Sequence, residues 1–249
     1  LRPRFRSVDG VVEPVIVSHT LYVNEPSPAL VVADLLGPVR EYPIQGGEPR
    51  ILFMARYPAA LARADLDGDG LRDFVVGELG SFKADDSDQG RLVWNRALQD
   101  GGFQRIDMGR MLARTADVAV GDFDGDGDQD VVGADFGWKN SGRLEILENR
   151  GAGVGGKLAM KPHLLDGAHG AVSVAIADVD ADGDQDIVAL FAQGREELIL
   201  YENTGKFAFH TRILFKAPTP MWGSLGVRIV DLDGDGDKDI LHYNGDNLD

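Results

Sequence analysis

The chain has 249 residues, a formal net charge of -16, 43% apolar residues and no cysteine. This apolar content can form a sizeable core, the excess of acidic residues argues against nucleic-acid binding, and the lack of cysteine excludes disulfides and thiolate metal sites. The sequence has no apolar run of membrane-spanning length, no initiator Met and no signal-like start, so we expect a processed chain or a piece of a longer one.

The first 60 residues are predicted to form strands without an acidic loop. The run ALVVADLLG from Ala29 alternates in the same way as VVGADFGW from Val131, much later in the chain. Alternation of this kind is typical of half-buried strands. We therefore interpret residues 1–60 as a degenerate copy of the units that follow, one without their aspartates.

Three units and the start of a fourth are predicted next, at residues 61–116, 117–171, 172–224 and 225–249. Each contains an Asp-rich nonapeptide, and these begin at Asp65, Asp122, Asp178 and Asp231, recurring about every 55 residues. An alternating apolar run precedes each nonapeptide, and a β-rich run follows it directly, as expected for two strands joined by a tight loop. Later runs such as RLEILEN and LAMKPHLL supply a third and a fourth strand.

Four strands in about 55 residues, without helical periodicity, predict an all-β fold. We expect a β-propeller with four-stranded blades, of which about four to five are present, in a single domain or fragment spanning residues 1–249. Two arrangements stay open. Residues 1–20 supply the outer strands that close a small ring, or the chain is part of a larger ring of about seven blades. In the second case, exposed end blades favour further blades or self-association.

The nonapeptides are predicted to bind calcium, about four ions in all. Several carboxylates without a neighbouring Cys select a hard cation, and Ca²⁺ accepts six to eight oxygen ligands in irregular geometry. We expect side-chain ligands at positions 1, 3, 5 and 9 and a main-chain carbonyl at position 7. The predicted metal-binding residues are Asp65, Asp67, Asp69, Leu71 and Asp73; Asp122, Asp124, Asp126, Asp128 and Asp130; Asp178, Asp180, Asp182, Asp184 and Asp186; and Asp231, Asp233, Asp235, Asp237 and Asp239.

Two alternative interpretations of these loops fit the sequence less well. An EF-hand requires flanking helices and a Glu at position 12, where this chain has Val76, Gly133, Ala189 and His242. A solvated Asp/Gly turn explains a single copy well, but four copies in one phase favour a metal site. Ala181 replaces the first glycine of the third loop, which predicts strain there.

These loops, the strand motif GRLEILENRG from Gly142 to Gly151 and the DFG at Asp135 resemble FG-GAP, or VCBS, repeats over about residues 29–249. The resemblance implies the propeller of integrin α-subunits and of bacterial secreted or surface proteins, with the loop aspartates as calcium ligands on one face. It also implies that the opposite face binds partners. In this chain that face would include Phe82, Lys83, Trp138, Lys139, His169, Met221 and Trp222. Packing between blades is the alternative role of the two tryptophans.

The predicted function is a non-catalytic calcium-binding propeller module for protein or carbohydrate interaction or adhesion. Its predicted location is extracellular, at the cell surface or periplasmic, because exposed calcium loops suit the calcium concentrations found outside cells. No nucleophile motif is present, and the histidines (His19, His163, His169, His210 and His242) share no motif spacing. The alternatives are the propeller of a secreted polysaccharide-degrading enzyme, whose catalytic groups would come from different blades, and a structural scaffold of a longer protein.

Overall fold

The computed structural model describes residues 4–8, 11–15, 29–33, 37–43, 46–81, 86, 88–110, 113–153 and 157–245. These residues form strands, turns and loops. Within this part of the chain, no helix is long and apolar enough to cross a membrane. The predicted residues Phe82 and Lys83, together with His19, lie outside the described residues.

The central part of the chain folds into three four-stranded antiparallel sheets of the same topology, in which strands adjacent in sequence pair with each other. The first sheet contains β6 (Pro58–Ala64), β7 (Asp73–Glu78), β8 (Arg91–Ala97) and β9 (Phe103–Arg110). The second contains β10 (Thr115–Gly121), β11 (Asp130–Asp135), β12 (Arg143–Ala152) and β13 (Leu158–Asp166). The third contains β14 (Ala171–Ala177), β15 (Asp186–Phe191), β16 (Glu197–Asn203) and β17 (Phe209–Lys216).

Smaller sheets lie on either side of these three in sequence. A three-stranded sheet contains β3 (Ala29–Ala33), β4 (Pro38–Pro43) and β5 (Arg50–Met54). The last sheet pairs β18 (Ser224–Val230) with β19 (Asp239–Asn244), and a separate hairpin pairs β1 (Arg4–Val8) with β2 (Val11–Val15). The connection between β3 and β4 runs only from residue 34 to residue 37, too short for an acidic nonapeptide.

The second strand of each complete sheet is buried along its whole length. All residues of β7, β11 and β15 are buried, because each strand lies between two strands of its own sheet and between neighbouring sheets. Strands buried on both faces have continuous apolar runs instead of alternation, as in the sequence DIVALF of β15. In contrast, β19 has a similar sequence but is only partly buried, because it pairs with β18 alone among the described strands.

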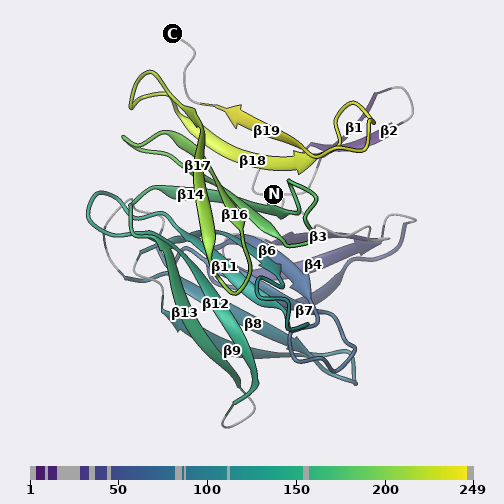
Figure 1. Ribbon diagram of the computed structural model, residues 1–249. Helices are drawn as coiled ribbons and strands as arrows, with labels where there is room; N and C mark the ends of the chain where they lie inside the picture. Colours follow the sequence, from purple (N-terminus) through teal and green to yellow (C-terminus); the bar gives the residue numbers. More distant parts are fainter. Residues whose placement is uncertain are drawn as a thin grey trace.

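The sheets pack against one another in chain order. The inner strands β6, β10, β14 and β18 are neighbours, and three apolar clusters fill the spaces between successive sheets. Figure 1 shows this succession from the blue and teal strands to the yellow ones. The predicted all-β fold with propeller-type four-stranded blades is therefore confirmed. Ring closure and the organisation as one domain stay predictions.

Candidate metal centre

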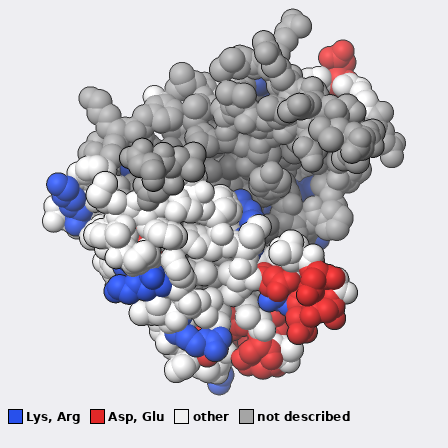
Figure 2. Space-filling model, turned by 90° about the horizontal axis from the view of Figure 1, so that it is seen from above, with Lys and Arg blue, Asp and Glu red and all other residues white. Residues whose placement is uncertain are grey.

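The four Asp-rich loops all lie at the same end of their sheets. Each loop joins the inner strand of a sheet to its second strand, and position 9 is the first residue of β7, β11, β15 or β19. In an antiparallel meander, the connections from second to third strand and from sheet to sheet lie at the opposite end. On the face shown in Figure 2, most of the visible Asp and Glu side chains gather in one region at the lower right, whereas Lys and Arg are scattered.

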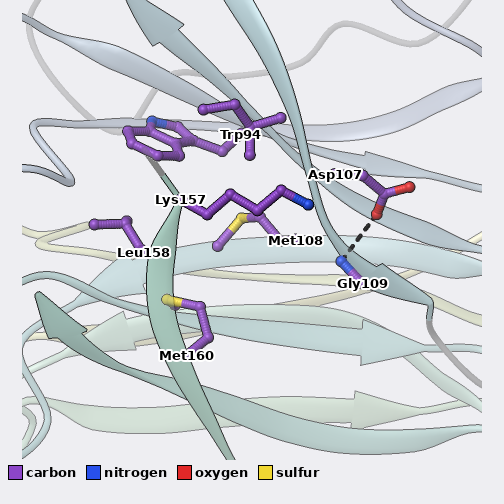
Figure 3. A pocket seen from close by; sticks show the side chains of 8 residues that line it. Trp94, Asp107, Met108, Gly109, Lys157, Leu158 and Met160 are labelled. Carbon is purple, nitrogen blue, oxygen red and sulfur yellow. Dashed lines mark hydrogen bonds between the residues drawn. The ribbon is translucent and has the colours of Figure 1, made fainter. Parts of the chain in front are cut away.

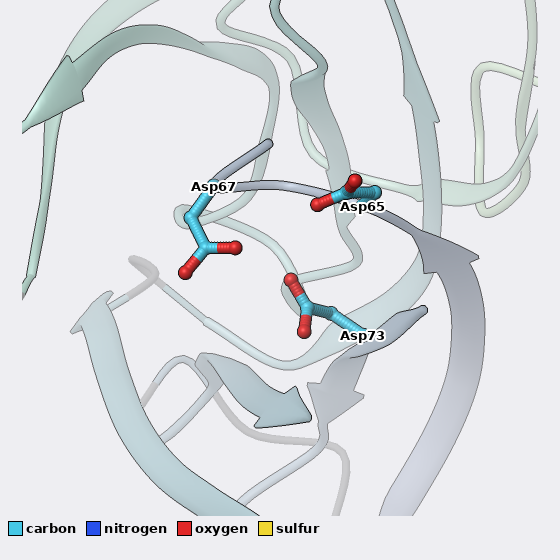
Figure 4. Close-up of side chains that lie close together, drawn as sticks. All are labelled: Asp65, Asp67 and Asp73. Atoms are coloured by element: carbon cyan, nitrogen blue, oxygen red, sulfur yellow. The ribbon is translucent and has the colours of Figure 1, made fainter. Parts of the chain in front are cut away.

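Three carboxylates converge in every loop. They belong to positions 1, 3 and 9, and one ligand oxygen from each lies within 4.8 Å of the other two. Figure 4 shows the first group, in which the three side chains point toward a common centre. The four triads are Asp65, Asp67 and Asp73; Asp122, Asp124 and Asp130; Asp178, Asp180 and Asp186; and Asp231, Asp233 and Asp239.

The Asp at position 9 ties the loop to the third strand of the sheet. In the second loop, Asp130 accepts hydrogen bonds from the N–H of Phe123 at 3.1 Å and from the N–H of Asn149 at 2.7 Å. Asp73 and Asp186 accept the equivalent pairs of bonds. Asp130 is only 1% exposed, and burial raises its pKa to about 7. A buried carboxylate of this kind ionises more readily when a cation binds beside it.

The Asp at position 1 fixes the curvature of the loop. Asp65 accepts hydrogen bonds from the N–H of Asp69 at 3.1 Å and of Gly70 at 2.8 Å, so the chain wraps around its carboxylate. The glycines at positions 4 and 6 have positive φ, for example 69° at Gly68. Ala181 adopts the same left-handed conformation with φ 61°, which is unfavourable for a residue with a Cβ. The strain predicted at this position is therefore present.

Positions 5 and 7 lie outside the triads. The carboxylate at position 5 accepts a hydrogen bond from the N–H of position 7, as between Asp126 and Asp128 at 2.8 Å and between Asp182 and Asp184 at 2.9 Å. This hydrogen bond restrains the turn between positions 5 and 7. The expected ligand roles of positions 5 and 7 stay predictions.

The donor set of each triad consists of carboxylate oxygens only, which suits a hard cation. The carboxylates also repel one another. Burial raises the pKa of Asp124, and the charges of Asp126, Asp122 and Glu148 raise it further. A divalent cation at the centre of the triad would remove this repulsion, so the geometry can hold a metal ion.

The first loop differs from the others because a basic side chain of the protein pairs with its carboxylates. Arg96 on β8 places Nε 2.5 Å from Asp67 Oδ2 and Nη2 3.2 Å from Asp69 Oδ2. The corresponding residues on the third strands of the next two sheets are Glu148 and Glu202. The first loop also has Leu71 at position 7, where the other three have Asp. Its negative charge is therefore smaller and partly neutralised within the protein.

In the second sheet, three basic side chains lie beside the acidic residue of the third strand. Glu148 lies 2.7 Å from Arg150 Nη2, 3.1 Å from Lys161 Nζ and 2.5 Å from His163 Nε2. Burial acts to raise the pKa of Glu148, but the hydrogen bonds from His163 and Lys161 bring it below its usual value. His210 pairs with Glu202 in the third sheet in a similar way, at 2.9 Å. Both histidines are thus partners of acidic residues beside the loops.

Two asparagines connect successive loops, a feature missed by the sequence reasoning. Asn149 donates from Nδ2 to the carbonyl of Gln129 in its own loop at 3.2 Å and to that of Leu66 in the preceding loop at 2.8 Å. Asn203 bridges the second and third loops in the same way. The corresponding residue in the first complete sheet is Ala97, and the sheet before it has no acidic loop to bridge. The sequence signal that could have indicated these bridges is the Glu-Asn dipeptide, which recurs in the third strand of two units.

Three of the residues expected to contact partners, Trp138, Met221 and Trp222, lie at the opposite end of the sheets. Trp138 is 41% exposed and Met221 is 80% exposed, while Trp222 packs beside Phe215 at a ring distance of 6.0 Å. Asp86 holds the loop between β11 and β12 by accepting hydrogen bonds from four consecutive backbone N–H groups, at residues 138–141. These hydrogen bonds lower the pKa of Asp86, and those from Lys139 and Asn140 contribute most.

A separate cavity lies between the outer strands β9 and β13, with a volume of about 540 Å³. Figure 3 shows its apolar wall, which includes Trp94, Met108 and Met160. Its one lining carboxylate, Asp107, accepts a hydrogen bond from the N–H of Gly109 at 2.9 Å. The lining therefore lacks the converging carboxylates of a metal centre.

Comparison with known protein families matches three overlapping stretches of the chain to the FG-GAP-like repeat: residues 65–133, 122–189 and 178–242. Each stretch begins at the first Asp of one nonapeptide and ends just after the next nonapeptide. Comparison with curated proteins finds no match. Together, the three stretches cover more than half of the chain, and the chain therefore belongs to the FG-GAP-like repeat family.

Proposed function

We propose that this chain is a calcium-binding propeller-type module that acts outside the cell or at its surface, where it contacts a protein or carbohydrate partner. The observation that carries the proposal is the convergence of three carboxylates in each of four loops. Backbone hydrogen bonds hold these carboxylates in place, so the loops are preorganised for a cation.

Calcium is the cation that best fits this geometry. The ligands come from a short irregular loop and include both side chains and, at position 7, a main-chain carbonyl. Ca²⁺ accepts such sets at about 2.3–2.6 Å, whereas Mg²⁺ requires near-octahedral geometry and retains several waters. Calcium binding also explains why Asp carboxylates are concentrated at one end of each sheet, where they would otherwise repel one another.

The location and the interaction role follow from the family and from the loops. FG-GAP repeats are typical of extracellular or surface proteins and generally serve as non-catalytic interaction modules. Exposed loops of this kind suit the calcium concentrations of about 10⁻⁴ to 10⁻³ M found outside cells. The exposed Trp138 and Met221 at the end opposite the loops offer apolar contact area to a partner.

Calcium titration of the chelator-treated protein by isothermal calorimetry tests the metal assignment. We expect about four ions at saturation and at least about tenfold weaker binding of magnesium. Asp124→Asn should weaken the second site by at least about tenfold, because it replaces a converging carboxylate with an amide.

Asp128→Asn is the matched control, because it removes the same charge from the same loop but leaves the position 7 carbonyl in place. We expect it to change the affinity of the second site by less than about threefold. Equal losses in the two variants, or equal binding of calcium and magnesium, would contradict the proposed coordination.

A further inference from the structure

A pocket of about 430 Å³ opens where the inner strands β6, β10, β14 and β18 meet the Asp-rich loops. We call it the axial pocket, and residues of all four inner strands line it. Its volume is within the range of about 300–1,000 Å³ typical of small-molecule sites. None of the loop triads has a residue among its lining residues.

The lining of the axial pocket is cationic in a strongly acidic protein. Four of its lining residues are Arg63, Arg72, Arg228 and Lys238, and none is Asp or Glu. The protein as a whole has 41 acidic and 25 basic residues. Basic side chains that line a pocket without a carboxylate among them attract anions, because the walls of the pocket focus their positive electrostatic potential.

The repeat itself directs polar groups into the axial pocket. Position 8 of each nonapeptide contributes one lining residue: Arg72, Gln129, Gln185 and Lys238. Because side chains alternate along a strand, the neighbouring Asp at position 9 points toward its triad while position 8 faces the pocket. Each of these four side chains can donate hydrogen bonds.

Two of the lining residues each have a buried side-chain atom without a hydrogen-bond partner among the described residues. Arg63 Nε is one, although its guanidinium lies 5.6 Å from the ring centre of Phe74. The other is Gln185 Oε1, which lies against Gly121 on β10. Arg228 is partly balanced by the charge of Asp117, whose carboxylate already accepts hydrogen bonds from Ser173 and Val174.

We propose that the axial pocket binds a small polyvalent oxyanion, with Arg63, Arg228 and Lys238 pairing with its negative oxygens and Gln129 and Gln185 donating hydrogen bonds. Arg and Lys pairs with carboxylate or phosphate oxygens are the stronger class of hydrogen bond. This site uses different side chains from the calcium triads, so it does not depend on the proposed function.

The test is calorimetric titration of the full chain at constant ionic strength with butyrate, succinate and propane-1,2,3-tricarboxylate, which carry one, two and three carboxylates. Succinamide is the neutral control for succinate. We expect affinity to rise with the number of carboxylates and succinamide not to bind at concentrations up to about 10 mM. Equal binding of the charged and neutral probes, or no binding of the tricarboxylate at about 10 mM, would overturn the proposal.

Variants locate the binding. Arg63→Gln should weaken tricarboxylate binding by about tenfold or more, and Lys238→Gln by at least about threefold, because each removes one charge-assisted contact. Lys238 lies on an exposed loop, so its variant tests the proposal even if Arg63→Gln folds poorly. Lys206→Gln, on the exposed turn between β16 and β17, is the matched control and should leave the affinity unchanged. The same affinity in Lys238→Gln and Lys206→Gln would place binding elsewhere and contradict the proposal.

Discussion

Arg96 is expected to make the first calcium site the weakest of the four. A bound calcium ion would lie about 2.4 Å from Asp67 Oδ2, the same oxygen that lies 2.5 Å from Arg96 Nε. The ion and the guanidinium would then be about 5 Å apart. In a water-like dielectric, a divalent ion and a single positive charge at this distance repel each other by about 1.7 kcal/mol, or about 15-fold in affinity.

Arg96→Gln should therefore increase calcium affinity at the first site by about 15-fold. Trp94 lies on the same strand as Arg96, and its side chain interacts with Asp73 of the first triad, so Trp94 fluorescence can report binding at this site. The other two tryptophans, Trp138 and Trp222, would be replaced by Phe in both the parent and the variant. Calcium is then titrated while the emission of Trp94 is recorded.

Arg50→Gln is the control for this experiment, because it removes the same charge from the exposed strand β5. It should leave the titration curve of Trp94 unchanged. If Arg96→Gln left calcium affinity at the first site unchanged or lowered it, the assignment of Arg96 as a competing cation would be refuted.

Four further predictions concern the loops and their connections. Calcium affinity at the second site should fall by about tenfold from pH 8 to pH 6, because calcium must displace a proton from Asp130 below its pKa of about 7; a pH-independent affinity would contradict this. Folding stability without calcium should change with pH in the opposite direction to calcium affinity. Because the pKa of Asp130 is higher in the folded than in the unfolded protein, the protein in chelator should lose stability as the pH rises from the unfolded-state pKa toward 7. Thermal unfolding in chelator at pH 5 and pH 7.5 measures this loss. Ala181→Gly should stabilise the calcium-loaded protein by about 0.5–1 kcal/mol in urea unfolding, because it relieves the positive φ, and a loss of stability would show that the position is not strained. Asn149→Ala should destabilise the protein by about 1–3 kcal/mol in the same assay, since the carbonyls of Leu66 and Gln129 lose their shared donor; a change below about 0.5 kcal/mol would mean that the bridge contributes little.

The features that the sequence predicts best are local ones. The nonapeptides place Asp and Gly at fixed positions, and the turn they form depends on residues within that segment. The hydrogen bonds that the N–H groups of Asp69 and Gly70 donate to Asp65 show this. The strands also follow from the alternation and the apolar runs on either side of each loop. Family membership could be predicted for the same reason, because the repeat signature is contained in short segments.

Features that depend on distant contacts were not predicted. Arg96 is 27 residues from Asp69, and Asn149 is 83 residues from Leu66. Their roles depend on the pairing of the third strand and on the packing of one sheet against the next. The cationic axial pocket combines position 8 of four loops with Arg63 and Arg228, and only the arrangement of inner strands brings them together. A comparison of Arg96 with Glu148 and Glu202 at the same repeat position could have indicated that the first loop is different.

The residues predicted to contact a partner differ in their surroundings in a way that the sequence does not show. Exposed aromatic and apolar side chains indicate an interaction surface without identifying what binds to it. Trp138, between β11 and β12, is exposed, whereas Trp222, between β17 and β18, lies beside Phe215, so the two tryptophans occupy different environments. Sequence alone gave no signal that distinguishes them.

Thermal unfolding of the full chain in about 2 mM calcium, in excess chelator, and in chelator with magnesium restored tests the central claim most directly. The account predicts a melting temperature at least about ten degrees lower in chelator, recovered by added calcium but not by magnesium. The same melting temperature in all three conditions would contradict it, because four carboxylate triads that bind structural calcium must lose stability when the ions are removed.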